Sequence, residues 1–229
     1  YTSGEPEDPP IRVGIPMADL CAPMFGVIGV LAAIHQAQRT GIGQHIDVSM
    51  LGALTMMVSV EPFDLLERCG IPQRTGQTLP RLAPFGVYPT KDGFIALCAP
   101  TEAMARAFFE AAGHPELALD EKFSTRNARF KNFQELNSFI EQFTLSLTSA
   151  EAVARLERAG APAAEVRTPY AATRDPRVVQ RGQTVPLLHP EHGAVEDVYG
   201  MGMPFTFSGS NVGFDQPPPE LGEHNDMVY

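Results

Sequence analysis

The longest apolar run of the chain, Leu20 to Ile34, constrains the fold more than any other segment. It contains one proline and two glycines, and it is shorter than the roughly 20 residues that a membrane-spanning helix needs. We therefore expect a buried core helix here and not a membrane span. The helix should end near Gly41 and Gly43, because glycine commonly follows the last turn of a helix.

A single acidic residue, Asp19, stands at the start of this run. Aspartate is a preferred N-cap residue, so the spacing alone favours a structural cap. The alternative is chemical. A helix N-terminus stabilises an anion through its dipole and its free backbone amides. A carboxylate that is shielded from water and open to a cleft can then act as a covalent nucleophile. The spacing does not decide between these two roles.

The composition is that of a globular protein. The 229 residues are 44% hydrophobic and 19% charged, enough for one large domain or two small ones. The formal net charge of −10 argues against nucleic acid or an anionic membrane as the main partner. It does not forbid an anionic substrate, because local basic residues can still bind one.

The cysteines and histidines give no sign of a disulfide framework or a metal site. The three cysteines lie far apart and include no CxxC pair, which favours a reducing, cytoplasmic setting. The six histidines are scattered, with no HxH or HExxH pattern, so we expect no bound metal. Phosphate-binding loops and the GxSxG motif of hydrolases are also missing from the sequence.

Residues 45–60 continue the first predicted domain, and residues 61–84 form a linker after it. Residues 45–48 alternate like a short strand, and Ser49 to Val60 is apolar enough for a second buried helix. Helices packed on a sheet in an α/β layer are the simplest arrangement for these elements. From residue 61 to 84, repeated prolines and the polar stretch 73–78 predict an exposed linker and a domain boundary.

The next segment has the pattern of a small α+β domain. Two strand-like pieces flank Lys91-Asp92-Gly93, a good hairpin signal. Helical spacing follows over residues 102–112 and in a phenylalanine stripe over 133–143 that we interpret as core. A third helix over 149–159 should have Ser149 as its cap and Gly160 as its stop. A strand within 161–166 completes the predicted domain.

The remaining residues predict short elements. After Pro169 come two short pieces, 170–173 and 175–182, and then strands within 183–188 and 195–207. The chain begins without a methionine, and residues 221–226 resemble the start of a helix. We therefore expect this sequence to be part of a longer polypeptide.

Several separated motifs together resemble the class III CoA-transferases, the superfamily of formyl-CoA transferase, carnitine CoA-transferase and α-methylacyl-CoA racemase. The resemblance covers nearly the whole chain. Its motifs occur in order at Gly14–Leu20, Arg39–Ser49, Ala83–Gly93, Phe123–Arg129 and Leu221–His224.

The resemblance implies an α/β fold: part of a Rossmann-like large domain plus a small α+β domain. Residues 1–62 would be the central part of the large CoA-binding domain, and 63–84 a linker. Residues 85–168 would form the small domain, and 169–229 a second linker with strands that return to the large domain. Such proteins form interlocked homodimers.

The resemblance also implies a catalytic role for Asp19. In these transferases the aspartate attacks an acyl-CoA thioester, and an aspartyl-CoA thioester forms and passes CoA to an acceptor acid. The partners would be acyl-CoA and carboxylic acid substrates, with no metal and no prosthetic group. Coenzyme A would enter as a thioester substrate. The CoA-contacting residues are not identified by the sequence.

Two other functions stay open. An acyl-CoA racemase or epimerase would use Asp19 as an acid/base and would form no acyl-enzyme. The chain could also be a non-catalytic fragment or an assembly module. Family members carry a long N-terminal segment that makes most of the CoA contacts, so the isolated fragment should be inactive. The glycine-rich substrate loop of formyl-CoA transferases has no counterpart in Gln73 to Pro80.

Overall fold

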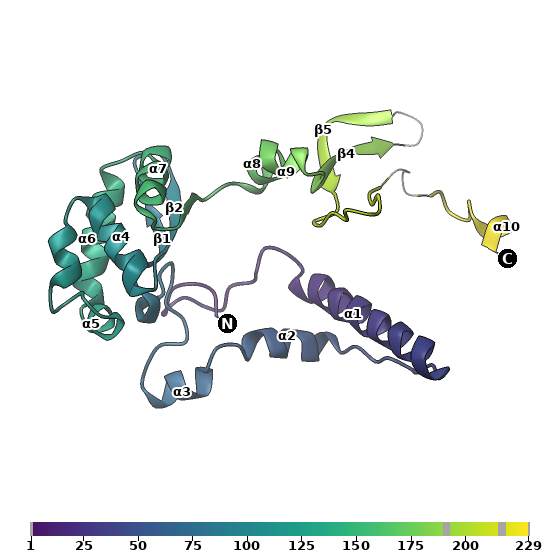
Figure 1. Cartoon of the computed structure of the whole chain (residues 1–229), viewed down its shortest axis with the longest axis horizontal. Helices are drawn as coiled ribbons and strands as arrows, with labels where there is room; N and C mark the ends of the chain where they lie inside the picture. Colours follow the sequence, from purple (N-terminus) through teal and green to yellow (C-terminus); the bar gives the residue numbers. More distant parts are fainter. Residues whose placement is uncertain (1, 190–192, 215–218, 229) are drawn as a thin grey trace. The chain divides into compact units, whose positions relative to one another are not determined.

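A computed structural model describes residues 2–189, 193–214 and 219–228 (Figure 1). The chain mixes helices and strands, as predicted, and divides into two compact units, Tyr1–Glu165 and Val166–Tyr229. Both sheets in the described part of the chain are antiparallel. The Rossmann-like large domain therefore stays a prediction.

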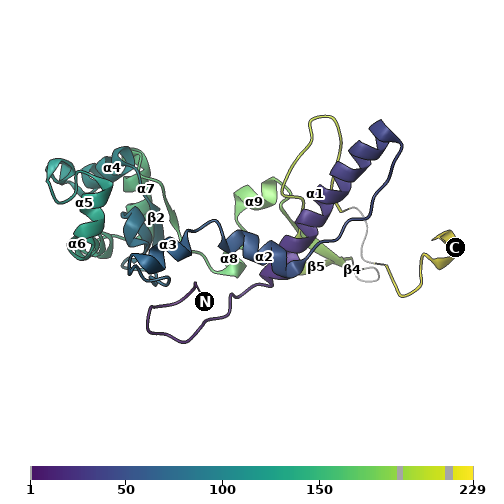
Figure 2. The ribbon, with the colours of Figure 1, turned by 90° about the horizontal axis from the view of Figure 1, so that it is seen from below.

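The first unit begins with a long helix, α1 (Met17–Thr40), followed by α2 (Met50–Val58) and α3 (Phe63–Arg68). Helices α1 and α2 lie side by side and are joined through residues 41–49 (Figures 1 and 2). Helix α1 ends at Gly41, whose φ of 72° is left-handed, which confirms the predicted stop. The Ser49 hydroxyl accepts the Gly52 N–H at 3.0 Å and caps α2.

Two predictions for this segment are wrong. Residues 45–48 form no strand, because a strand needs a hydrogen-bonded neighbour and none of the described strands pairs with this segment. Helices α1 and α2 are not buried, since Leu31 is 61% exposed and Leu51 77% exposed. In the two helices only Cys21, Ala22 and Ala53 are buried, because no described element covers the remaining apolar side chains.

The length of α1 also differs from the length expected of the apolar run. The helix has 24 residues, and by length and composition it could cross a membrane. The apolar run from Leu20 to Ile34 covers only 15 residues of this helix. A single helix of this kind is weak evidence for a membrane, because core helices of soluble proteins have the same length and composition.

The region from residue 83 to 165 has its own core around a three-stranded sheet. Strands β1 (Phe85–Pro89), β2 (Phe94–Cys98) and β3 (Ala163–Glu165) are antiparallel in the order β1-β2-β3. Val87 lies opposite Ala96, and the predicted hairpin turn at Lys91–Gly93 is confirmed. The helical elements are η1 (Pro80–Leu82), α4 (Glu102–Ala112), η2 (Pro115–Leu119), α5 (Arg126–Lys131), α6 (Phe133–Leu145) and α7 (Ser149–Ala159).

The predicted phenylalanine stripe is core. Phe108 is fully buried and packs edge-on against Phe109, Phe139 and Phe143, with ring centroids 5.4, 6.1 and 5.8 Å away. Apolar side chains spaced three or four residues apart bring one face of each helix to the sheet. Fully buried members of the same core include Tyr88, Ile95, Leu97, Leu136, Ile140 and Leu156.

The predicted cap of α7 is wrong by one residue. Thr148 is the N-cap: its hydroxyl accepts the Glu151 N–H at 3.3 Å, while a Glu151 carboxylate oxygen accepts the Thr148 N–H at 2.9 Å. This reciprocal pair is a capping box. Ser149 is the first helical residue. Its hydroxyl lies 2.7 Å from the Thr90 hydroxyl, and its N–H donates to Asp92 at 2.7 Å.

A buried arginine fixes the end of the linker to this core. Arg129 is 1% exposed and donates to the carbonyl oxygens of Ala83, Phe123 and Pro100 at 2.9, 3.1 and 3.3 Å. Burial lowers the pKa of Arg129, because a charged guanidinium is costly to remove from water. One turn earlier on α5, the Arg126 side chain donates to the Arg81 carbonyl at 2.9 Å.

The described part of the second unit begins with two short helices and a pair of strands. They are α8 (Pro169–Thr173), α9 (Pro176–Gln180), and the antiparallel strands β4 (Thr184–His189) and β5 (Gly193–Met201). The strand predicted to reach Phe207 stops at Met201, where its pairing with Thr184 ends. A last short helix, α10, spans Asn225–Val228.

Candidate active site

Asp19 lies in the first turn of α1 but does not cap it. Pro16 occupies the N-cap position, so Asp19 is the third helical residue. The interpretation of Asp19 as the N-cap is therefore wrong. Helix α1 begins at Met17, directly after Pro16, whose restricted φ and missing N–H are compatible with the start of a helix. The first hydrogen bonds run from Met17 N to Ile15 O and from Leu20 N to Pro16 O, at 2.9 and 3.1 Å.

The Asp19 carboxylate is exposed and free of competing contacts. Within the described residues, no hydrogen bond or ion pair engages this side chain. The backbone N–H groups of Ala18 and Asp19 likewise have no acceptor in the part of the chain that the structure describes. A helix terminus with unpaired amides favours negative charge nearby. Both lone-pair-bearing oxygens of Asp19 are therefore available to an incoming electrophile.

The glycine-containing motif after α1 is a structural stop. The Gly41 N–H donates to the Ala37 carbonyl at 2.8 Å, and the Ile42 N–H donates to the Thr40 hydroxyl at 3.2 Å. The Gln44 side-chain amide donates to the side-chain oxygen Oε1 of Gln36 at 3.0 Å. These contacts close the helix end locally, as a C-cap loop does.

A large cavity lies along the linker of residues 63–84. Its volume is about 930 Å³, which is within the range of small-molecule sites. Its wall includes the charged residues Glu61 and Arg81, which form an ion pair with each other. Apolar side chains from α3, α5 and α6 contribute to the lining together with residues near the start of the chain and polar residues of the linker, and Asp19 is not part of the lining.

One residue in this wall could not be recognised from the sequence. Arg74 falls in the polar stretch predicted to be exposed, yet it is 3% exposed. Its guanidinium donates to main-chain carbonyls near the start of the chain. Neighbouring polar residues hide this role in the sequence, because an arginine between Gln73 and Thr75 is ordinarily a solvated loop residue.

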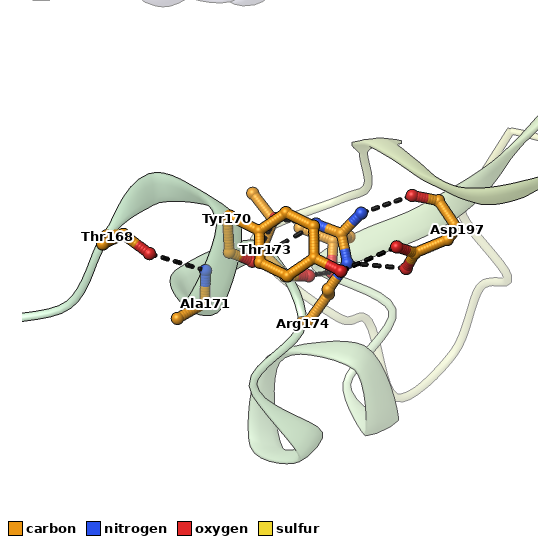
Figure 3. Close-up of polar contacts among 7 residues, drawn as sticks. Thr168, Tyr170, Ala171, Thr173, Arg174 and Asp197 are labelled. Atoms are coloured by element: carbon orange, nitrogen blue, oxygen red, sulfur yellow. Dashed lines mark hydrogen bonds and ion pairs between the residues drawn. The ribbon is translucent and has the colours of Figure 1, made fainter.

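A second set of polar contacts lies in the other unit (Figure 3). The Tyr170 hydroxyl and the Arg174 Nε both donate to the Asp197 carboxylate, at 2.7 and 2.8 Å. The Arg174 guanidinium also lies 3.6 Å from the centre of the Tyr170 ring. The Arg174 hydrogen bond, followed by that of Tyr170, lowers the pKa of Asp197, and the bond to Asp197 raises that of Tyr170. The cluster joins α8 to β5.

The backbone at Asp197, in the same cluster, has an unusual conformation. Asp197 has a φ of 54°, a left-handed conformation that is uncommon for non-glycine residues, although aspartate tolerates it better than most. Nothing in the sequence around Asp197 suggested either this conformation or the contact with Arg174. Among the described residues, no group of three or more His, Cys, Asp or Glu side chains is arranged to hold a metal ion.

Comparison with known proteins extends over nearly the whole chain. A family model described as CoA-transferase family III matches residues 1–225. The chain is 33% identical to succinyl-CoA–D-citramalate CoA-transferase of Chloroflexus aurantiacus, over 99% of this chain and 56% of that protein. It is 30% identical to succinate–glutarate CoA-transferase of Agrobacterium fabrum, again over 99% and 56%. The chain thus spans about half the length of these relatives.

Solved structures agree with this match. A CAIB/BAIF family protein from Brucella suis superposes with a TM-score of 0.74 at 27% identity, covering 98% of this chain and 57% of that one. A variant of the Rv3272 protein from Mycobacterium tuberculosis gives a TM-score of 0.80 at 21% identity, covering 98% and 57%. The second likeness concerns the fold alone.

Proposed function

This chain belongs to CoA-transferase family III, and on that premise we propose that the full-length protein transfers coenzyme A between carboxylic acids, with Asp19 as the nucleophile. Family membership and the names of the two relatives support CoA transfer. The observation that carries the role of Asp19 is its position. It lies in the first turn of α1, exposed and unengaged by any described residue.

The proposed reaction proceeds in four balanced steps. The Asp19 carboxylate attacks the acyl-CoA carbonyl, which gives a mixed anhydride and releases the CoA thiolate. The thiolate attacks the aspartyl carbonyl, which gives an aspartyl-CoA thioester and releases the donor acid. The acceptor carboxylate attacks this thioester, which gives a second mixed anhydride, between Asp19 and the acceptor, and again releases the CoA thiolate. The thiolate attacks the acceptor carbonyl, so the acceptor leaves as its CoA thioester and Asp19 is regenerated.

The position of Asp19 suits the first step. A capping carboxylate would be held by its own helix amides, and attack would first have to break those hydrogen bonds. Pro16 occupies the N-cap position of α1, so the Asp19 carboxylate makes no capping hydrogen bond that attack would have to break. The unpaired amides of Ala18 and Asp19 would favour negative charge at this helix end.

Substitution of Asp19 in the full-length protein tests the proposal. We expect Asp19→Ala to lower the rate of CoA exchange on the order of a thousandfold or more, because the nucleophile is gone. The matched control is Asp64→Ala, which removes a carboxylate from the first turn of α3. Circular dichroism of both variants should match the parent. An Asp19→Ala variant that retains turnover would overturn the proposal.

Trapping separates transfer from its rivals. The full-length protein is incubated with succinyl-CoA, the donor named for the Chloroflexus aurantiacus relative, and then with hydroxylamine. An aspartyl thioester is converted to the hydroxamate, which peptide mass spectrometry locates at Asp19. Inversion of an α-carbon without a hydroxamate would instead indicate a racemase that uses Asp19 as acid and base. No exchange with any donor and acceptor pair would indicate a non-catalytic module.

The names of the relatives suggest the substrate class. Both pair succinate or succinyl-CoA with another short dicarboxylic acid, citramalate or glutarate. We extend this class to the full-length protein and would screen acceptors of four to six carbons. A cytoplasmic homodimer is proposed from the family resemblance and from the three free cysteines. Light scattering of the full-length protein would test the dimer.

A further inference from the structure

Arg74 holds the beginning of the chain against the linker. Its Nε donates to the Glu5 carbonyl at 3.0 Å, and its Nη2 donates to the Pro6 carbonyl at 3.4 Å and to the Asp8 carbonyl. The side chain is 3% exposed. A buried guanidinium is costly to desolvate, and the hydrogen bonds to these main-chain carbonyls offset that cost. Residues 5–8 are therefore bound to residue 74 by side-chain to main-chain contacts.

A second contact two residues away secures the same segment. The Gly76 N–H donates to the Gly4 carbonyl at 3.2 Å. Gly76 has a φ of 65°, and a Cβ at this position would overlap the Glu5 carboxylate. The turn thus needs glycine for its backbone conformation, whereas the flexible end of the Glu5 side chain can turn away from an added Cβ. Arg74 and Gly76 together form what we call the N-terminal clamp.

The clamped segment leads directly to the proposed nucleophile. Asp8 is followed by Pro9 and Pro10, and Pro16 immediately precedes helix α1. Proline fixes φ near −65° and restricts the residue before it, so this connection has fewer conformations than an ordinary loop of its length. Fixing residues 5–8 therefore narrows the positions open to the first turn of α1.

We propose that Arg74 is a positioning residue for Asp19, acting through the N-terminal clamp and the proline-containing segment that leads into α1. The inference rests on the proposed function, because it concerns the rate at which Asp19 attacks a thioester. Arg74 itself takes no part in the chemistry. Loss of the clamp lets residues 4–16 move, and Asp19 then spends less time aligned with the bound acyl group.

The test is a single-turnover experiment on the full-length protein. Enzyme in excess over succinyl-CoA is quenched with hydroxylamine, and the Asp19 hydroxamate is followed over time. The final amount of hydroxamate, or amplitude, measures the fraction of enzyme that can react. The rate constant of its formation measures how well Asp19 is aligned with the acyl group. For Arg74→Ala we expect the rate constant to fall roughly 10- to 100-fold, the size of effect that small misplacement of a reacting group produces. The amplitude per folded molecule should be unchanged.

Three companion measurements sharpen the result. Arg74→Lys should restore only part of the rate, since an ammonium lacks the planar fork that reaches several carbonyls. Guanidinium ion added to Arg74→Ala should recover part of the rate. Arg68→Ala, which removes an exposed arginine from the last turn of α3, is the matched control and should keep the parent rate.

Gly76→Ala breaks the clamp from its other side. It should slow the reaction as Arg74→Ala does and should raise amide hydrogen exchange over residues 2–16. This variant covers the case in which Arg74→Ala does not fold. A lowered amplitude with an unchanged rate constant in both variants would reduce Arg74 to a structural residue and overturn the inference alone. A parent protein that never forms the Asp19 hydroxamate would overturn the proposed function and this inference together.

Discussion

Two regions of the first unit use apolar helices in opposite ways. Helices α4, α6 and α7 each turn one apolar face to the β1-β2-β3 sheet and leave polar residues outside. Helix α1 is apolar around most of its circumference, and its side chains lie largely on the surface, as at Leu31. In the first arrangement, other residues of this chain cover the apolar face of each helix. The second requires a covering surface that the described residues do not supply.

The difference is one of pattern, not of hydrophobicity. A helix with a single apolar stripe needs only one neighbouring surface to cover that stripe, so a three-stranded sheet and the helices packed on it suffice for a closed core. A helix that is apolar all round belongs in the interior of a larger structure or in a membrane. The relatives that match this chain are nearly twice its length. We expect the full-length protein to cover α1 and α2.

A matched pair of leucine substitutions tests the comparison most strongly. Leu136→Ala removes a fully buried side chain from α6 and should lower the free energy of unfolding by about 2–5 kcal/mol. Leu31→Ala removes a side chain that is mostly exposed on α1 and should change it by no more than about 0.5 kcal/mol. Urea unfolding of the 229-residue chain, followed by far-UV circular dichroism, measures both.

The same pair in the full-length protein decides whether α1 is covered there. If added residues bury Leu31, the loss of unfolding free energy caused by Leu31→Ala should rise toward the loss caused by Leu136→Ala. An equally small effect of Leu31→Ala in both lengths would contradict the expectation that α1 is an interior helix. A large effect in the 229-residue chain would instead mean that α1 is already covered there.

The small-domain region could be predicted from the sequence because its signals are local. The Asp92-Gly93 turn and the phenylalanine stripe each depend on residues that are close together in the sequence, and the structure agrees with both predictions. The predicted strand at 45–48 failed because a strand needs a pairing partner from another part of the chain. The prediction that α1 is buried failed for the same reason, because the residues that would cover it have to come from outside the helix.

The candidate site was less predictable. Spacing favoured a cap at Asp19, and only the ordered motifs of a family pointed to chemistry. The structure removes the capping role, because Pro16 occupies the N-cap position. Arg74 and Asp197 could not have been found from sequence. The partners of Arg74 are carbonyls nearly 70 positions away, and those of Asp197 are side chains more than 20 away.

A smaller effect sharpens the comparison at the helix starts. Helix α7 begins with the Thr148–Glu151 capping box, whereas α1 begins without any side-chain cap. Thr148→Ala should lower the free energy of unfolding by about 1 kcal/mol, and Thr148→Ser should restore most of it. Urea unfolding measures both. If Ser149 were the cap, Thr148→Ala would be nearly neutral, so this substitution also checks the corrected boundary.

The smallest expected effect concerns pH in the same closed region. The Asp92 carboxylate accepts the Ser149 N–H at 2.7 Å and the Thr90 hydroxyl at 3.2 Å, and the backbone bond is the main reason that its pKa is lowered. A lowered folded-state pKa means that the unfolded chain binds the proton more readily. The contribution to stability is therefore complete above the ordinary aspartate value of about 3.9 and is lost as the pH falls through the lower folded value.

Asp92→Asn should remove this dependence, because an amide cannot ionise although it can still accept the Ser149 N–H. The difference in unfolding free energy between parent and variant should be constant at neutral pH and should shrink in acid below about pH 4. Urea unfolding at a series of pH values measures it, with Asp64→Asn as the control for loss of one carboxylate from α3. A difference that grows in acid would reverse the sign of the linkage. The Ser149 contact would then not favour the ionised form of Asp92, and the link between the hairpin turn and α7 would have to rest on the Thr90–Ser149 hydroxyl pair alone.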